Sequence, residues 1–278
     1  MPQKTWSNKR ERQYEHIKDS AKKRGTSTKR AKQAKRSACA RSAHAGLPRT
    51  KCAAFRAEAS LGGVEPRILD HVAFWVTERD AIVDVATRQL GMHVIDHQDN
   101  FTLIGSDARR GKLTLFDAEG PRERGAFKHV ALRVSSLDGA DHAELPGGID
   151  VRLVEAPTEV EYDLDHVALY TEDPDVTAEA YLDYGFAPAA PKDGIRRVEV
   201  GGAHVEFHQG DPGQTDHPLL NHLAVLVDSA EDHKRDAEET GIEVESVVDA
   251  ANTYAVFLWG PDRVRIEYVG HKPTFSIT

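Results

Sequence analysis

Apolar and polar residues alternate around a histidine at four places in the chain, with nearly the same sequence each time. In every copy the histidine is followed by valine or leucine and then alanine, as in a short strand. The copies occupy residues 69–73, 128–132, 164–169 and 221–225. The histidines of alternate copies lie 95 and 93 residues apart, so the chain repeats a pair of unlike units. Such a repeat indicates that one structural unit recurs along the chain.

The pattern after the first copy predicts one helix and three more strands. Residues 68–76 alternate like a strand, which places His71 and Ala73 on one face and Val72 on the other. Residues 78–90 have apolar positions at helical spacing and end before Gly91, a residue type that commonly ends helices. Strand-like runs follow at 93–97, 101–105 and 112–117. The first unit is therefore predicted to be strand, helix and three strands, written βαβββ.

The other three units follow the same plan with variations. Their first strands are predicted at 127–134, 164–171 and 220–227. Helices are predicted at 174–184 and 230–240, while the second unit has only a short one around 137–143. The remaining strands are predicted at 150–154, 186–190, 194–200, 204–208, 243–248, 254–259 and 264–269. The chain is thus expected to be an α+β protein of four tandem βαβββ modules.

Charge divides the chain into a basic arm and an acidic body. Residues 1–52 contain 16 Lys and Arg against 3 Asp and Glu, while the remainder contains 20 against 42. We expect residues 1–65 to be a helical or disordered arm and linker, with a helix near 8–24. Such an arm suits contact with nucleic acid through phosphate neutralisation, but also a solvated tail or contact with the acidic body.

Composition also limits the class of protein. No apolar run approaches the roughly 20 residues of a membrane-spanning helix, and no secretory signal is present, so a cytoplasmic protein without membrane contact is expected. Cys39 and Cys52 are the only cysteines and both lie in the arm. Neither a disulfide framework nor a cysteine-based zinc site is therefore expected.

The repeated histidine strands and the βαβββ order resemble the vicinal oxygen chelate superfamily. It includes glyoxalases, epimerases, bleomycin-resistance proteins and type I extradiol ring-cleaving dioxygenases. The resemblance covers about residues 67–271. It implies that modules pair into open-barrel cups, giving an N-terminal domain at 66–160 and a C-terminal domain at 161–272. It also implies metal ligands on the first and last strands of modules, and a homo-oligomer.

The resemblance assigns a metal site to the C-terminal domain. His166 and His222 hold the two first-strand positions, and Glu267 lies on the last strand. Two imidazoles and one carboxylate form the set that holds iron(II) in many oxygenases and leaves positions open. In the N-terminal domain, Thr114 and Arg152 fall at the last-strand positions. That domain is therefore expected to be metal-free, with His71 and His129 as packing or hydrogen-bonding residues.

Glu206 and His208 of the third module are compatible with two different kinds of reaction. His204, Glu206 and His208 alternate onto one face of a strand. Glu206 stands where glyoxalase-like and epimerase-like relatives place a further ligand or base. His208 is close to where extradiol enzymes carry an acid–base histidine, and its ordinary pKa of roughly 6.5 suits that role.

The leading interpretation is an iron(II)-dependent extradiol dioxygenase that acts on a small catecholic aromatic and dioxygen. Phe257 and Trp259 are expected to contact the substrate. The extradiol pattern has a tyrosine ten residues before the carboxylate ligand, and Phe257 at that place lacks the phenol hydroxyl.

Two alternatives remain. A lyase or isomerase would use His166, Glu206, His222 and Glu267 around nickel, zinc, cobalt or manganese and stabilise an enediolate. A non-catalytic protein would use the cup to bind a small molecule, with aromatic residues such as Tyr254 lining or supporting it.

Overall fold

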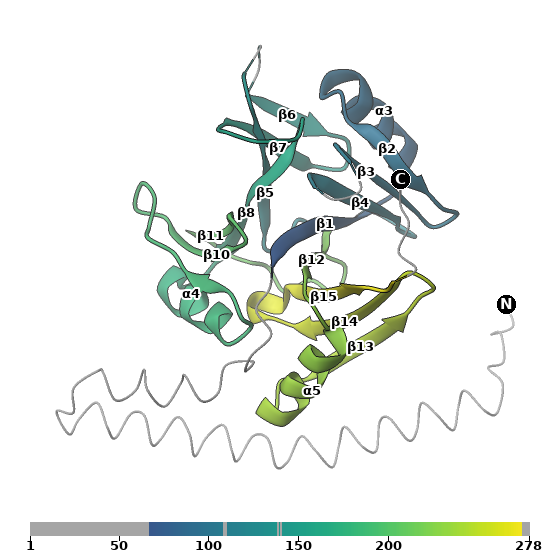
Figure 1. Cartoon of the computed structure of the whole chain (residues 1–278). Helices are drawn as coiled ribbons and strands as arrows, with labels where there is room; N and C mark the ends of the chain where they lie inside the picture. The colour runs from purple at the N-terminus through teal and green to yellow at the C-terminus, as the bar shows by residue number, and fades with distance from the viewer. Residues whose placement is uncertain (1–66, 108–109, 138, 140, 274–278) are drawn as a thin grey trace, which may run out of the picture. The chain divides into compact units, whose positions relative to one another are not determined.

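The computed structural model describes residues 67–107, 110–137, 139 and 141–273. The predicted basic arm at 1–65 lies outside these residues. These residues belong to one compact unit. The described chain has two mixed β-sheets and few helices, so it is an α+β protein as predicted (Figure 1).

The first and fourth modules together form the first sheet. Its eight strands run in the order β13-β14-β15-β12-β1-β4-β3-β2. These strands are β1 (Ile68–Val76), β2 (His93–His97), β3 (Phe101–Gly105), β4 (Lys112–Asp117), β12 (Leu220–Leu226), β13 (Val244–Asp249), β14 (Thr253–Trp259) and β15 (Arg265–His271). β1 and β12 pair antiparallel at the middle, and each is flanked by the parallel last strand of its own module.

The second and third modules form the second sheet in the same way. Its seven strands run in the order β6-β7-β5-β8-β11-β10-β9. These strands are β5 (Phe127–Val134), β6 (His142–Leu145), β7 (Ile149–Glu155), β8 (Asp163–Thr171), β9 (Ala187–Pro188), β10 (Arg196–Val200) and β11 (Ala203–Gln209). β5 and β8 pair antiparallel at the middle, with β7 and β11 parallel to them on either side.

The modules therefore pair differently from the prediction. Adjacent modules were expected to form domains at 66–160 and 161–272, but the outer two modules share one sheet and the inner two share the other. The division near residue 160 thus separates strands that are hydrogen-bonded neighbours, such as β5 and β8. Sequence repetition explains the error, because all four first strands carry the same pattern and present equivalent edges.

The two central strand pairs even use the same register. In the first sheet, His71 lies opposite Ala224 and Ala73 opposite His222. In the second sheet, His129 lies opposite Ala168 and Ala131 opposite His166. Local sequence does not choose among partners that fit equally well, so the choice depends on the linkers and on packing between the sheets.

Three helices cover parts of the sheets, and local signals set their ends. They are α3 (Arg79–Gln89), α4 (Pro174–Leu182) and α5 (Ala230–Thr240). The Asp173 side chain caps α4 by accepting from two backbone N–H groups, and Ser229 caps α5 by accepting from one. α5 ends at Gly241, whose φ of 77° is left-handed. The short helix predicted around 137–143 is wrong, because β6 begins at His142 within this range.

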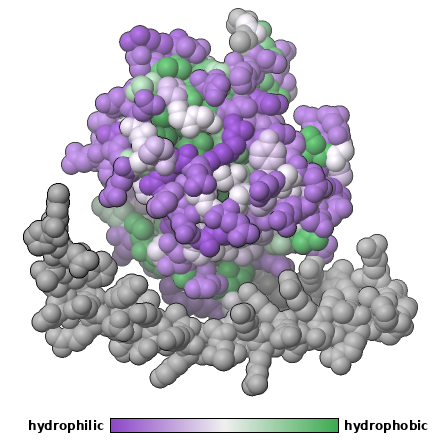
Figure 2. All heavy atoms as spheres, turned by 180° about the vertical axis from the view of Figure 1, so that it is seen from behind, coloured by the Kyte–Doolittle hydropathy of each residue, from purple (hydrophilic) through white to green (hydrophobic). Residues whose placement is uncertain are grey.

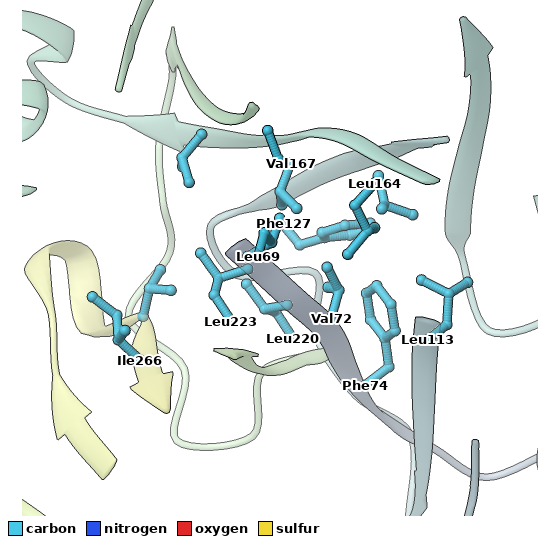
Figure 3. Close-up of a cluster of buried hydrophobic side chains, with 14 of the residues drawn as sticks. Leu69, Val72, Phe74, Leu113, Phe127, Leu164, Val167, Leu220, Leu223 and Ile266 are labelled. Carbon is cyan, nitrogen blue, oxygen red and sulfur yellow. The ribbon is translucent and has the colours of Figure 1, made fainter. Parts of the chain in front are cut away.

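The core lies between the two sheets. In Figure 3, Val72 and Phe74 of β1 and Leu223 of β12 lie close to Phe127 of β5 and Val167 of β8. The rings of Phe74 and Phe127 meet edge to face, 5.0 Å between centroids, and both are fully buried. Side chains alternate along a strand, so the histidines adjacent to these apolar residues point to the opposite faces of the sheets.

Hydrophilic residues cover most of the face shown in Figure 2, with small separate hydrophobic patches. The large apolar side chains that are exposed among the described residues are Val94, Val176, Val247, Val248 and Trp259. No helix in the described part of the chain is both long and apolar enough to cross a membrane.

One buried histidine makes the fold sensitive to acid. His233 of α5 has no exposed surface and stacks on Tyr268 at 3.9 Å between ring centroids. Neither ring nitrogen has a hydrogen-bond partner within the described chain. Burial lowers the pKa of His233 to about 4. Between this value and the ordinary 6.5, the unfolded chain binds a proton that the folded protein does not.

We predict that His233 makes the free energy of unfolding fall as the pH drops from about 6.5 to about 4. The loss attributable to this group is about 2–3 kcal/mol, from the two pKa values and 1.36 kcal/mol per unit. Urea unfolding of wild type and His233→Phe across this range measures it. Towards acid, the free energy of unfolding of the wild type should fall relative to that of the variant, and parallel curves would contradict the assignment.

Candidate metal centre

A β-bulge precedes the histidine in each of the four first strands. The strand registers shift at the residue before each histidine, namely Asp70, Lys128, Asp165 and Asn221. A bulge adds one residue to a strand and re-aims its side chain. The residue before each histidine is thereby brought close enough to reach the imidazole ring.

Three of these bulge residues accept a hydrogen bond from the neighbouring Nδ1 atom. The distance is 2.8 Å for Asp70 and His71, 2.7 Å for Asp165 and His166, and 3.0 Å for the amide oxygen of Asn221 and His222. A histidine that binds a metal through Nε2 usually donates its Nδ1 hydrogen to such an acceptor, which fixes the tautomer and ring orientation. Three imidazoles are thus held with Nε2 available as a ligand.

The last strand of each module places one side chain beside the histidine. Glu267 lies next to Ala224, Glu206 next to Ala168, Thr114 next to Ala73 and Arg152 next to Ala131. Each alanine is two residues after its histidine and shares its face of the sheet. The third and fourth modules therefore offer a carboxylate, and the first and second offer none, as the sequence predicted.

His71, His222 and Glu267 meet on the first sheet and are called the first centre. The Nε2 atoms of the two histidines are 3.1 Å apart. Oε2 of Glu267 lies 2.9 Å from Nε2 of His222 and 3.3 Å from Nε2 of His71. Within the described residues this is the one group of three or more metal-ligand side chains whose ligand atoms all lie within 4.8 Å of one another.

These separations fit a shared divalent ion. Ligand atoms about 2.1 Å from one ion and at right angles to each other lie about 3 Å apart. Oε2 of Glu267 is buried and, within the described chain, accepts no well-directed hydrogen bond despite its two close imidazoles. A buried acceptor of this kind needs a partner, and a cation supplies one. The centre therefore fits a metal ion through two nitrogens and one oxygen.

The charges of the first centre are strongly coupled. Burial alone would lower the pKa of His71, but the hydrogen bond to Asp70 and the nearby Glu267 raise it to about 9. Burial alone would raise the pKa of Glu267, but the adjacent imidazoles of His222 and His71 hold it well below its usual range. A carboxylate that stays ionised is ready to bind a cation, whereas His71 must first release a proton.

Further contacts fix the outer shell of this centre. Lys112 is buried and donates to both oxygens of Asp70, at 2.8 and 2.9 Å. Burial alone would raise the pKa of Asp70, but its bonds with His71 and Lys112 lower it to about 2. Arg265 donates to the Asn221 amide oxygen at 2.8 Å, so that oxygen faces both Arg265 and His222. The Asp70 carboxylate and the Asn221 amide oxygen are thus held in place beside the two histidines.

Two phenylalanine rings lie beside the first centre. The ring of Phe257 on β14 lies 5.2 Å from that of His222, and the ring of Phe116 on β4 lies 6.0 Å from it. The guanidinium of Arg265 lies 4.6 Å from the centre of the Phe257 ring. Thr114, at the last-strand position of the first module, is buried and neutral. The centre thus has three ionisable side chains with two aromatic rings beside His222.

A second group of ligand-type side chains lies on the second sheet and is called the second cluster. It contains His129, His166, Glu206 and His208. The Nε2 atoms of His129 and His166 are 3.0 Å apart, and Oε2 of Glu206 is 3.6 Å from His166 Nε2 and 3.5 Å from His208 Nε2. Burial, the neighbouring His166 and the cations Arg152 and Lys128 lower the pKa of His129 to about 3.

The predicted ligand set His166, His222 and Glu267 is therefore wrong in one member. His166 lies on β8 of the second sheet against His129, whereas His222 and Glu267 lie on the first sheet with His71. His71 had been predicted to be structural. The signal for it was present, because Asp70-His71 repeats Asp165-His166. Only the strand pairing shows which histidine joins which carboxylate.

The other predicted site residues are divided between the two groups. Glu206 and His208 belong to the second cluster, so they do not serve the first centre. Phe257 packs on His222 as expected for a residue near the site. Trp259, at the end of β14, is 37% exposed and contacts Arg263 and Arg265. Its predicted substrate contact stays a prediction.

We predict that Asp70→Asn weakens metal binding at the first centre by about 10- to 100-fold, because it removes the charge that orients His71. Equilibrium dialysis with metal analysis measures this change. Asp165→Asn is the matched control, since Asp165 makes the same contact to His166 on the other sheet. Equal losses of the tightly bound ion in both variants would contradict the assignment of His71 to the centre.

Comparison with known proteins supports the architecture. No family model matches the sequence, and no curated protein is detectably similar to it. Among solved structures, a Bacillus subtilis protein named "putative dioxygenase" aligns with a TM-score of 0.62 at 15% identity, over 76% of this chain and 87% of that one. A glyoxalase I variant from Zea mays aligns with a TM-score of 0.60 at 17% identity, over 78% and 96%. The chain thus has the vicinal oxygen chelate fold.

Proposed function

We propose that the protein is an iron(II)-dependent ring-cleaving dioxygenase that acts on a catecholic aromatic at the first centre. The observation that carries the proposal is the meeting of His71, His222 and Glu267 at mutual distances near 3 Å. Two histidines and one carboxylate on one side of an ion leave several positions open. This is the ligand set of non-haem iron(II) oxygenases.

The residues around the triad suit this chemistry. When bound, iron(II) supplies coordination of both substrates and the electrons that activate dioxygen. Asp70 and Asn221 orient the two imidazoles, and Glu267 remains ionised. Phe116 and Phe257 offer apolar surface beside His222 on which a flat aromatic ring can pack.

The role predicted for His208 changes under this proposal, whereas that of Phe257 does not. His208 contacts Glu206 and Lys128 in the second cluster, so the proposal gives it no acid–base role at the first centre. Phe257 acts through its ring alone, because it has no hydroxyl group.

The four ligands that the lyase or isomerase alternative requires do not lie together. They divide between the sheets, with His166 and Glu206 in the second cluster and His222 and Glu267 in the first centre. The fourth position of the first centre holds Thr114 in place of a carboxylate. The likeness to glyoxalase I is one of fold and by itself assigns no ligand set.

We predict that protein loaded anaerobically with iron(II) consumes dioxygen when a catechol is added and forms a yellow ring-opened product. Glu267→Gln and His71→Gln should reduce the rate by at least about 100-fold, because removal of a direct ligand exceeds the 10- to 100-fold effect of outer-shell changes. An oxygen electrode and absorbance spectroscopy measure both.

The control variant is His166→Gln, which alters the second sheet and leaves the first centre intact. It should retain the rate of the wild type. An iron-loaded wild type without oxygen uptake on simple and substituted catechols would contradict the proposed reaction. Activity lost in His166→Gln but retained in His71→Gln would contradict the proposed centre.

A further inference from the structure

We propose that the second cluster is a second site for a divalent transition-metal ion, bound by His129, His166 and Glu206 more weakly than at the first centre. This inference does not depend on the proposed reaction, because it concerns the other sheet. It also gives His129 the role of a ligand, where the sequence predicted a packing or hydrogen-bonding residue of a metal-free N-terminal domain.

The first argument is positional equivalence. His129 and His166 lie on the central antiparallel strands of the second sheet in the register that His71 and His222 have in the first. Their Nε2 atoms are 3.0 Å apart, compared with 3.1 Å in the first centre. The two pairs of rings also meet at similar angles, 77° and 74°. Nitrogen atoms at this separation suit a common cation.

The second argument is the outer shell of His166. Its Nδ1 donates to Asp165 at 2.7 Å, and Asp165 in turn accepts from Arg133 at 3.1 Å. This anchored carboxylate fixes the ring with Nε2 directed towards His129 and Glu206. Carboxylate–histidine pairs of this kind are common behind metal ligands.

His208 completes the site as a positioning residue. Lys128 Nζ lies 2.9 Å from Nδ1 of His208, and an ammonium group can only donate, so Nδ1 accepts. The neutral ring therefore carries its hydrogen on Nε2, which lies 3.5 Å from Oε2 of Glu206. His208 in this tautomer is no ligand, but its N–H faces the carboxylate that the ion requires.

Three differences make the second site weaker. The bulge residue before His129 is Lys128, which cannot accept, and Nδ1 of His129 is buried without a partner in the described chain. Lys128 and Arg152 place positive charge beside the cluster. Within the described residues, only the first centre has all its ligand atoms within 4.8 Å of one another. The side chain of Glu206 must therefore rotate to bring its carboxylate oxygen close to both His129 and His166.

Equilibrium dialysis of the full chain against cobalt(II), followed by metal analysis, tests the proposal. The wild type should bind two equivalents, with the second at least about tenfold weaker, as expected for an unanchored ligand. Glu206→Gln and His129→Gln should each lose only the weaker equivalent, and Glu267→Gln only the tighter one. Circular dichroism establishes that each variant is folded.

Lys128→Asp offers a gain of function at the same position. It places an acceptor before His129, as Asp70 stands before His71, and should tighten the weaker equivalent by about tenfold or more. His204→Gln, on the same strand as Glu206, is the matched control and should change neither affinity. A wild type that binds one equivalent overturns the proposal. So does a second equivalent that persists in both Glu206→Gln and His129→Gln.

Discussion

The antiparallel contact between β1 and β12 is the constraint on which the first centre depends. It joins strands from the two ends of the βαβββ series, 151 residues apart at His71 and His222. Once Ala73 lies opposite His222 in this ladder, the two imidazoles share one face. The parallel neighbour β15 then adds Glu267 on the same face. Three ligand-type side chains from separate strands meet because hydrogen bonds between backbones fix the spacing of these strands.

The β-bulges place a hydrogen-bond acceptor beside three of the four histidines. In a regular strand, the residue before a histidine would point to the opposite face. The extra residue at each bulge lets Asp70, Asp165 and Asn221 reach the neighbouring ring instead. At the second copy the bulge residue is Lys128, and His129 has no such acceptor in the described chain. The residue type at one bulge thus decides whether the neighbouring imidazole has an acceptor for its Nδ1 hydrogen.

Equivalent positions on the two sheets have diverged in charge while keeping their geometry. The first centre has neutral Thr114 at the position where the second cluster has the cation Arg152. Aromatic side chains lie beside the first centre, whereas Arg152 is exposed. A nearby cation disfavours the binding of another cation, so the same backbone arrangement gives the two groups different electrostatic surroundings. The core between the sheets does not distinguish the two, since it is formed by the opposite faces (Figure 3).

The sequence by itself determined the modules, most strand bounds, the histidine positions and the carboxylates at Glu206 and Glu267. These are local properties, since periodicity and glycine stops act over a few residues. It did not determine which modules pair. The four first strands have the same sequence pattern and pair in the same register, so local interactions do not favour one partner over another. Packing of Phe74 against Phe127 between the sheets is among the long-range contacts that accompany the observed choice. Only the tertiary structure therefore joined His71 to His222 and placed His166 with His129.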